Sequence, residues 1–125
     1  MSEEMFEKGL AMRRKVLGDA YVDSVLKGAD EFSQPLQEYV TKYCWGDVWN
    51  RPGLELRTRS LLNLAMLAAL NRPHELKIHL RGALNNGVSK QEISEVFLQV
   101  AAYCGAPAAM DAIRVAGELF RELGK

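Results

Sequence analysis

The sequence predicts an all-α fold, in which a single domain of residues 1–125 forms a helical bundle that assembles into oligomers. Three observations predict the helices. Apolar residues recur at the spacing of one helix face, capping residues and prolines separate these stretches, and the sequence shows no β-hairpin signal, repeat or low-complexity tract. A length of 125 residues fits one domain, and we expect the N-terminal helices of residues 1–32 to pack on the core or on a neighbouring subunit.

The composition narrows the classes of function. Hydrophobic residues make up 48% of the chain, as in a globular protein, and 16 basic residues balance 16 acidic ones. Without a basic excess, neither nucleic acid nor an anionic membrane is an expected partner. The acidic N-terminus has no apolar signal-peptide core, so we expect a cytoplasmic protein. Cys44 and Cys104 form no CxxC motif, which argues against a redox dithiol or a zinc site, and both thiols are expected to be buried or half-buried.

The first 53 residues are predicted to form three helices followed by a long irregular connection. Residues 3–17 form the first helix, which stops at Gly18. Asp19 can cap the second helix and Ser33 the third. The stretch Trp45–Gly53, rich in Gly, Asn and Pro, is the predicted connection. The residues expected to face inward are Val22, Val25, Leu26 and Ala29 on the second helix and Leu36, Tyr39, Val40 and Tyr43 on the third.

The stretch Leu61–Leu70 holds a single polar residue, Asn63, among ten. A helix that is apolar on every face is a buried helix. Ten residues span only about 15 Å, which is too short to cross a membrane. A small domain has little interior in which to hide such a helix, so we expect a partner subunit to cover part of it.

The next predicted helix places a histidine among core residues. Pro73 suits its first turn, and Asn86-Gly87 is a natural left-handed C-cap. His79 lies on the predicted inward stripe, where it is either a core residue bonded to a carbonyl or a functional residue. The stripe consists of Leu76, His79, Leu80, Ala83 and Gly87.

Two further helices complete the predicted bundle. A capping box, Ser89 to Glu92, opens the first, and Gly105 ends it. Pro107 starts the second. The apolar faces are expected to comprise Ile93, Val96, Phe97, Val100 and Ala101, and then Ala109, Ala112, Ile113, Ala116, Leu119 and Leu123.

Aromatic and cationic residues crowd the stretch from Trp45 to Arg59. Its three arginines, one of them Arg51, outnumber the acids, so they either form an anion site or pair with neighbouring carboxylates. Arg57 and Arg59 cannot face the same way on a helix, so at most one points into a given pocket. Trp45 and Trp49 lie four residues apart and either line one wall of a pocket or pack in the core.

The histidine helix carries a second candidate group. Arg72, Glu75 and His79 are spaced by three and four residues, so they lie along one side. Glu75 can hold the imidazole in one tautomer, or it is a solvated first-turn acid that the helix dipole favours. Gly82 in the middle of the helix lowers helix stability by about 1 kcal/mol relative to alanine. A glycine is expected there if another helix or a ligand packs closely against it.

The runs WGDVWNRPGLELRTRS, LAMLAAL and HELKIHLRGALNNGVSKQEISEVFLQVAAYCGAPAA resemble the carboxymuconolactone decarboxylase family over about residues 34–116. The wider superfamily includes alkyl hydroperoxide reductase D-like peroxidases, whose motif is CxxCxxxH. The histidine of that motif matches His79, but Arg72 and Glu75 stand at the two cysteine positions. Thiol peroxidase activity is therefore not expected.

The resemblance implies an all-helical homo-oligomer, typically a hexamer, and decarboxylation of 4-carboxymuconolactone to 3-oxoadipate enol-lactone in protocatechuate breakdown, with no cofactor and no metal. It makes His79 a predicted catalytic residue, with Glu75 beside it. Residues expected to bind the small carboxylate or lactone substrate are Arg51, Arg59, Trp45, Trp49 and Tyr103. Two alternatives stay open: a related decarboxylase or isomerase acting on another small lactone or carboxylic acid, and a non-catalytic oligomeric binding protein.

Overall fold

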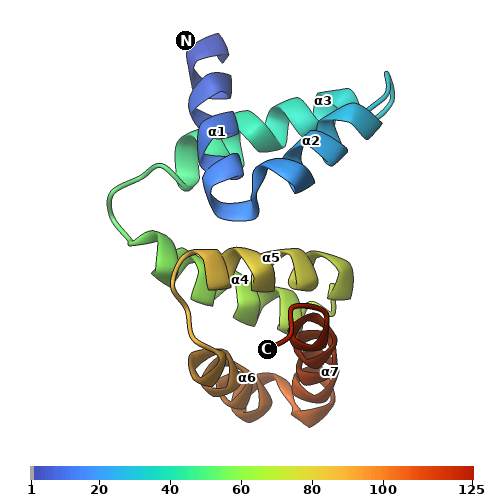
Figure 1. Cartoon of the computed structure of the whole chain (residues 1–125). Coiled ribbons are helices and arrows are strands. Elements are labelled where there is room, and N and C mark those ends of the chain that lie inside the picture. The colour runs from blue at the N-terminus through green and yellow to red at the C-terminus, as the bar shows by residue number, and fades with distance from the viewer. Residues whose placement is uncertain (1) are drawn as a thin grey trace. The chain divides into compact units, whose positions relative to one another are not determined.

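A computed structural model describes residues 2–125, and none of them lies in a β-strand (Figure 1). The all-α prediction is therefore confirmed for this part of the chain. The elements are α1 (Ser2–Leu17), α2 (Asp19–Gly28), α3 (Gln34–Tyr39), the π-helix η1 (Val40–Val48), α4 (Leu56–Ala69), α5 (Pro73–Asn85), α6 (Lys90–Cys104) and α7 (Ala106–Glu122).

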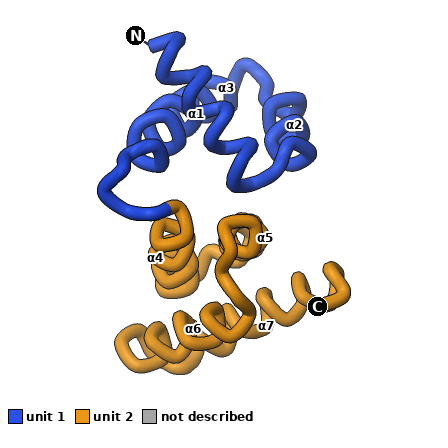
Figure 2. The backbone as a smooth tube through the Cα atoms, turned by 60° about the vertical axis from the view of Figure 1, so that its left-hand side comes forward, with its two compact units in different colours: residues 1–55 blue, residues 56–125 orange. Residues whose placement is uncertain are grey.

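The chain divides into two compact units, Met1–Glu55 and Leu56–Lys125, which Figure 2 colours differently. The first unit contains α1 to η1, and the second contains α4 to α7. Within the first unit, α1 packs against η1. Whether the whole chain behaves as one domain stays a prediction.

The first unit is built on a close approach between the backbones of α1 and η1. A Cβ atom added at Gly9 would lie 1.8 Å from the carbonyl oxygen of Thr41 and 2.8 Å from the amide nitrogen of Gly46. A Cβ added at Gly46 would lie 2.4 Å from the carbonyl oxygen of Met5. Only glycine leaves room for backbones at this separation, so the two glycines determine how the two helices pack.

The predicted irregular connection is wrong over its first half. The helix that begins as α3 continues as a π-helix to Val48, and helical structure resumes only at Leu56. The inward face predicted for the third helix is also wrong, because Leu36, Tyr39 and Tyr43 are all exposed. The buried face of η1 is formed instead by Thr41, Trp45 and Gly46, since the widened helical turn changes which residues share a face.

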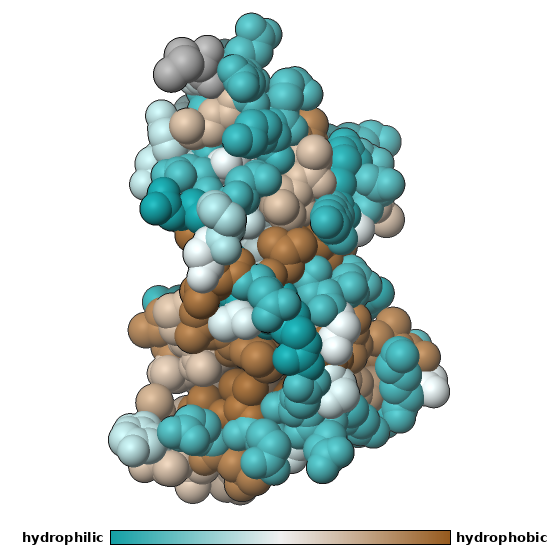
Figure 3. Space-filling model, turned by 90° about the vertical axis from the view of Figure 1, so that its left-hand side faces the viewer, coloured by the Kyte–Doolittle hydropathy of each residue, from teal (hydrophilic) through white to brown (hydrophobic). Residues whose placement is uncertain are grey.

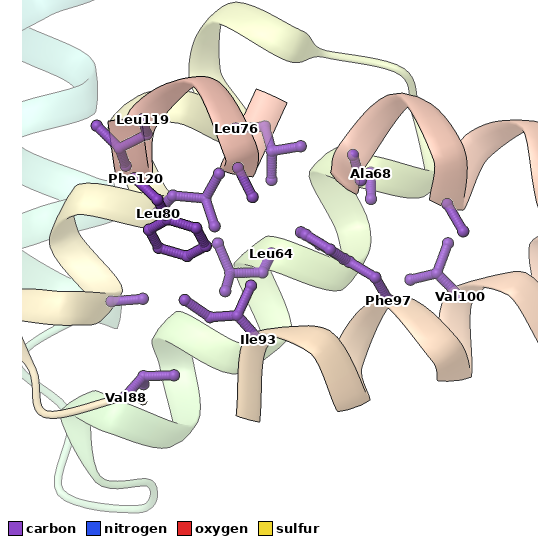
Figure 4. Close-up of a cluster of buried hydrophobic side chains, with 14 residues drawn as sticks. Leu64, Ala68, Leu76, Leu80, Val88, Ile93, Phe97, Val100, Leu119 and Phe120 are labelled. Carbon is purple, nitrogen blue, oxygen red and sulfur yellow. The ribbon is translucent and has the colours of Figure 1, made fainter. Parts of the chain in front are cut away.

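The second unit has one apolar core, to which all four of its helices contribute (Figure 4). The capping box of Ser89 and Glu92 is confirmed, and Gly87 has the positive φ of 87° expected after α5. Fully burying a Leu, Ile or Phe side chain contributes about 1.5–3 kcal/mol, so this core dominates the stability of the unit. Its largest fully buried side chains are Leu64, Leu76, Leu80, Ile93, Phe97 and Leu119.

Within the single chain, helix α4 is buried on one face only, and the expected cover of its other side by a partner subunit stays a prediction. Ser60, Leu64 and Ala68 are buried, whereas Leu62 and Met66 are 47% and 52% exposed. Figure 3 shows hydrophobic residues gathered on one face of the second unit. The buried side of α4 packs in the core with the other helices of the second unit, and the side that carries Leu62 and Met66 is exposed in the single chain. No helix within residues 2–125 is long and apolar enough to cross a membrane.

Candidate active site

His79 lies in the middle of α5, and the packing of that helix fixes its position. Pro73 stands in the first turn of the helix, where a missing amide hydrogen costs nothing. Leu76, Leu80 and Ala83 are buried in the core of the second unit. His79 is next to Leu80 and only partly buried, so its ring lies at the edge of the core rather than inside it.

The side chain of Asn63 reaches this ring from α4. The Asn63 Nδ2 atom lies 3.3 Å from the Nδ1 atom of His79, and both side chains are partly buried. The sequence reasoning did not assign Asn63 to the site. A signal was present, because Asn63 is the single polar residue of the run Leu61–Leu70. A lone polar residue in an apolar helix is expected to have a partner.

The carboxylate predicted to orient His79 is not in contact with it. Glu75 is exposed, and within residues 2–125 no hydrogen bond or ion pair joins it to His79. The neighbouring Arg72 is also exposed, and its Nη1 atom donates to the carbonyl oxygen of Leu70 at 3.4 Å. Glu75 stays a predicted catalytic residue, and Asn63 is a residue that contacts the ring.

The two arginines at the start of α4 lie in different environments. Arg57 binds both carboxylate oxygens of Glu92 through its Nη2 atom, and this contact links α4 to α6. The Arg57 guanidinium, followed by the backbone amide of Ser89, lowers the pKa of the Glu92 carboxyl to about 2. Arg57 therefore has a structural role. Arg59 is partly buried and stays the predicted substrate ligand of the pair.

The remaining aromatic candidates lie in the first unit. Trp45 and Trp49 stack with ring centroids 4.7 Å apart and an angle of 17° between the planes. They are 4% and 6% exposed, and the side-chain amide of Asn50 donates to the carbonyl oxygen of Trp45 at 2.8 Å. The two rings therefore pack on each other, and their role in binding the substrate stays a prediction.

Arg51 lies on the surface of the first unit. Its Nη1 atom is 3.7 Å from the Asp47 carboxylate, and most of its side chain is exposed. Arg51, Lys8 and Asn50 line one side of a surface cavity of about 360 Å³. Glu4 and Asp47 line the same cavity, so its two cations are balanced by two carboxylates.

Tyr103 and the two cysteines lie at exposed positions. Tyr103, near the end of α6, is 83% exposed. Cys44 and Cys104 are free and exposed, so the expectation of buried or half-buried thiols is wrong. Within the part of the chain that the structure describes, no group of three or more His, Cys, Asp or Glu side chains could hold a metal ion.

Comparison with known proteins gives consistent matches. The sequence model of the carboxymuconolactone decarboxylase family matches residues 34–118. The chain is 43% identical over 122 residues to a 4-carboxymuconolactone decarboxylase of Acinetobacter baylyi, covering 98% of this chain and 91% of that protein. It is also 40% identical over 123 residues to a nitrosuccinic acid decarboxylase of Metarhizium robertsii, covering 98% of this chain and 86% of that protein.

Proposed function

Because the chain belongs to the carboxymuconolactone decarboxylase family and is a carboxy-lyase, we propose that it converts 4-carboxymuconolactone to 3-oxoadipate enol-lactone without a cofactor. The observation that carries this proposal is the 43% identity, over almost the whole chain, to a protein named for that substrate. The reaction would serve protocatechuate breakdown in the cytoplasm.

The chemistry of this substrate explains why no cofactor is needed. The departing carboxylate is attached to a ring carbon that is conjugated through a C=C bond with the lactone carbonyl. When the C–CO2 bond breaks, its electron pair spreads to that carbonyl oxygen. A proton then adds to the α carbon, so that the substrate loses CO2 and gains one proton. The enzyme needs to bind the second carboxylate, exclude water from the first and stabilise the oxyanion.

We assign these tasks to the predicted site residues. His79 stabilises the developing oxyanion and supplies the proton, because it is a partly buried imidazole in a helix that the core holds rigidly. Arg51 or Arg59 binds the acetate carboxylate through its guanidinium group. Glu75 and Tyr103 are the remaining predicted polar contacts, and the stacked Trp45 and Trp49 support the segment that carries Arg51.

A second substrate is favoured by the relative named nitrosuccinic acid decarboxylase. In nitrosuccinic acid, the carbon that loses CO2 carries a nitro group, which accepts the electron pair as the lactone carbonyl does. This molecule also has a second carboxylate on a neighbouring carbon. The same three tasks therefore apply, and the shape of the pocket decides between the two acids.

We also propose that the protein works as a homo-oligomer, with a hexamer as the expected form. The exposed apolar side of α4, which includes Leu62 and Met66, supports this assignment because large apolar side chains in neighbouring turns are usually covered. Light scattering of the wild-type chain at micromolar concentration should give a multiple of the chain mass, and Met66→Lys should shift it towards smaller species. A wild-type monomer would contradict this assignment.

The function is tested by supplying each acid to the purified protein and measuring the release of CO2. We expect turnover of 4-carboxymuconolactone, and we expect His79→Gln to lower kcat by about 10²-fold or more while the fold is kept. The matched control is His74→Gln, since His74 is an exposed residue in the first turn of the same helix. CO2 release from nitrosuccinic acid alone would favour the second substrate, and release from neither acid would reject both.

A further inference from the structure

Asn63 stands out on α4 because of what surrounds it in the sequence and in space. Its neighbours from Leu61 to Leu70 are all apolar, yet its amide lies partly buried against α5 with its nitrogen 3.3 Å from His79 Nδ1. An amide withdrawn from water without a partner costs about 1–3 kcal/mol. The contact with the imidazole offsets that cost, and it explains why a polar residue is tolerated in this run.

The chemistry of the amide and the imidazole bears on which ring nitrogen of His79 carries the proton. The amide nitrogen of asparagine only donates, and it has no lone pair with which to accept a hydrogen bond. With the amide nitrogen of Asn63 towards the ring, a hydrogen bond forms when the ring nitrogen that faces it is unprotonated. In a neutral imidazole with an unprotonated Nδ1, the single ring proton is on Nε2.

We propose that Asn63 is a positioning residue, which holds the neutral ring of His79 as the Nε2–H tautomer and so presents Nε2–H as a hydrogen-bond donor to the developing oxyanion of the substrate. The contact also fixes the ring plane, because Nδ1 has to point at α4. The part of this inference that concerns catalysis rests on the function proposed above. The part that concerns the tautomer depends only on the contact between Asn63 and His79.

A neighbouring contact shows that α4 and α5 are joined by polar groups along this side. The Nδ2 atom of Asn86 donates to the Ser60 hydroxyl at 2.9 Å, and Ser60 is 1% exposed. Ser60 lies three residues before Asn63, so the two residues are on adjacent turns of one helix face. The Ser60–Asn86 bond keeps the helices in register, and this register brings Asn63 to the ring of His79.

The tautomer can be measured without any substrate. The chain has two histidines, so a His74→Gln background leaves His79 as the single one. In protein labelled with 15N-histidine at neutral or higher pH, we expect the chemical shift of an unprotonated nitrogen for Nδ1 and that of a protonated nitrogen for Nε2. The opposite assignment would overturn the proposal, because it would mean that the amide oxygen faces a protonated Nδ1.

Two substitutions test the role of the amide. Asn63→Asp keeps the shape but can only accept, so we expect it to place a proton on Nδ1. Asn63→Leu removes the donor and should give a mixture of tautomers. Both should lower kcat by about 10-fold or more with little change in KM, since they alter the reacting ring and not the binding of the substrate. Asn71→Asp, at an exposed position after α4, is the control for the added charge and should be neutral.

The outcomes separate this inference from the proposed function. If the wild-type protein shows the Nε2–H tautomer but releases CO2 from neither acid, the function fails and the positioning by Asn63 stands. If both Asn63 variants fold, keep the wild-type tautomer and keep their kcat, the positioning role is overturned while the function stands. If neither variant folds, the spectrum of the His74→Gln protein still decides whether Nδ1 is unprotonated.

Discussion

The two units of the chain are stabilised in different ways. The second unit, Leu56–Lys125, has a continuous apolar core to which four helices contribute. In the first unit, Met1–Glu55, two glycines let α1 and η1 approach closely, and the polar Arg13 and Thr41 are buried alongside apolar residues such as Val16, Val22 and Trp45. The Arg13 Nη1 atom donates to Thr41 Oγ1 at 3.2 Å and to Gln37 Oε1 at 3.0 Å. An apolar core tolerates changes of shape better than a contact between backbones does.

The largest effect is expected in the core of the second unit. Phe97→Ala removes a ring that is 1% exposed and leaves a cavity, so it should lower the free energy of unfolding by about 3–5 kcal/mol. Chemical denaturation followed by circular dichroism measures this loss. The adjacent Leu98 is 60% exposed, and Leu98→Ala should change the stability by less than about 0.5 kcal/mol. Equal losses for the two variants would contradict the assignment of the core.

The corresponding test in the first unit is the addition of a single methyl group. Gly9→Ala would place a Cβ 1.8 Å from the Thr41 carbonyl oxygen, and a backbone atom cannot move aside as a side chain can. We expect a loss of about 3 kcal/mol, at the upper end of the usual cost of overpacking. Both tryptophans of the chain lie in this unit, so their fluorescence during denaturation reports on it directly.

Gly28→Ala is the matched control for Gly9→Ala. A Cβ at Gly28 would meet no atom within 4 Å, and alanine is a better helix former than glycine. This variant should therefore be as stable as the wild type or slightly more stable. If Gly9→Ala behaved in the same way, α1 and η1 would not pack through their backbones, and the contrast between the two units would be lost.

The same contrast explains how much of the fold the sequence could predict. In α6, apolar residues recur at helical spacing, and Ile93, Phe97 and Val100 are buried as predicted. In the first unit, the inward face was assigned from Leu36, Tyr39 and Tyr43, which are exposed. Apolar spacing could not reveal a buried face on which glycine and threonine accompany Trp45, and it assumes a regular helix where the chain forms a π-helix.

The family was predicted correctly, the catalytic role of His79 stays a prediction, and the sequence reasoning did not name Asn63 as a neighbour of the histidine. Glu75 was chosen because residues four apart share a helix side, and that rule applies only within one helix. Asn63 reaches His79 from another helix, sixteen residues away in sequence. Contacts between helices depend on how the helices pack, and the sequence alone did not reveal this. The position of Asn63 as the single polar residue in an apolar run did indicate that its side chain has a polar partner.

A smaller effect tests the polar interior of the first unit. Thr41→Val keeps the volume of the side chain and removes the hydroxyl that accepts from Arg13, whose pKa burial lowers. The guanidinium is left with an unmet hydrogen bond, so the free energy of unfolding should fall by about 1–3 kcal/mol. Thr41→Ser keeps the hydroxyl and should lose less. If valine were tolerated better than serine, the packing of the methyl group would matter more than the hydrogen bond.

The smallest effect concerns the ion pair that links α4 to α6 in the second unit, and it depends on pH. The Glu92 carboxyl has its pKa lowered from 4.5 to about 2, first by Arg57 and then by the backbone amide of Ser89. A carboxyl whose pKa is lower in the folded state stabilises the fold above its unfolded pKa. The contribution of Glu92 should therefore be complete above about pH 4.5 and decline as the pH falls towards 2.

The variant that tests this is Glu92→Gln, which removes the charge and keeps the size. At neutral pH it should be less stable than the wild type by a small amount, because the pair is exposed to solvent. The difference in melting temperature between the two proteins should shrink steadily between pH 4.5 and pH 2. Glu95→Gln is the control, since Glu95 is exposed on the same helix. A difference for Glu92→Gln that stayed constant across this range would mean that the loss comes from the capping box with Ser89 and not from the charge that faces Arg57.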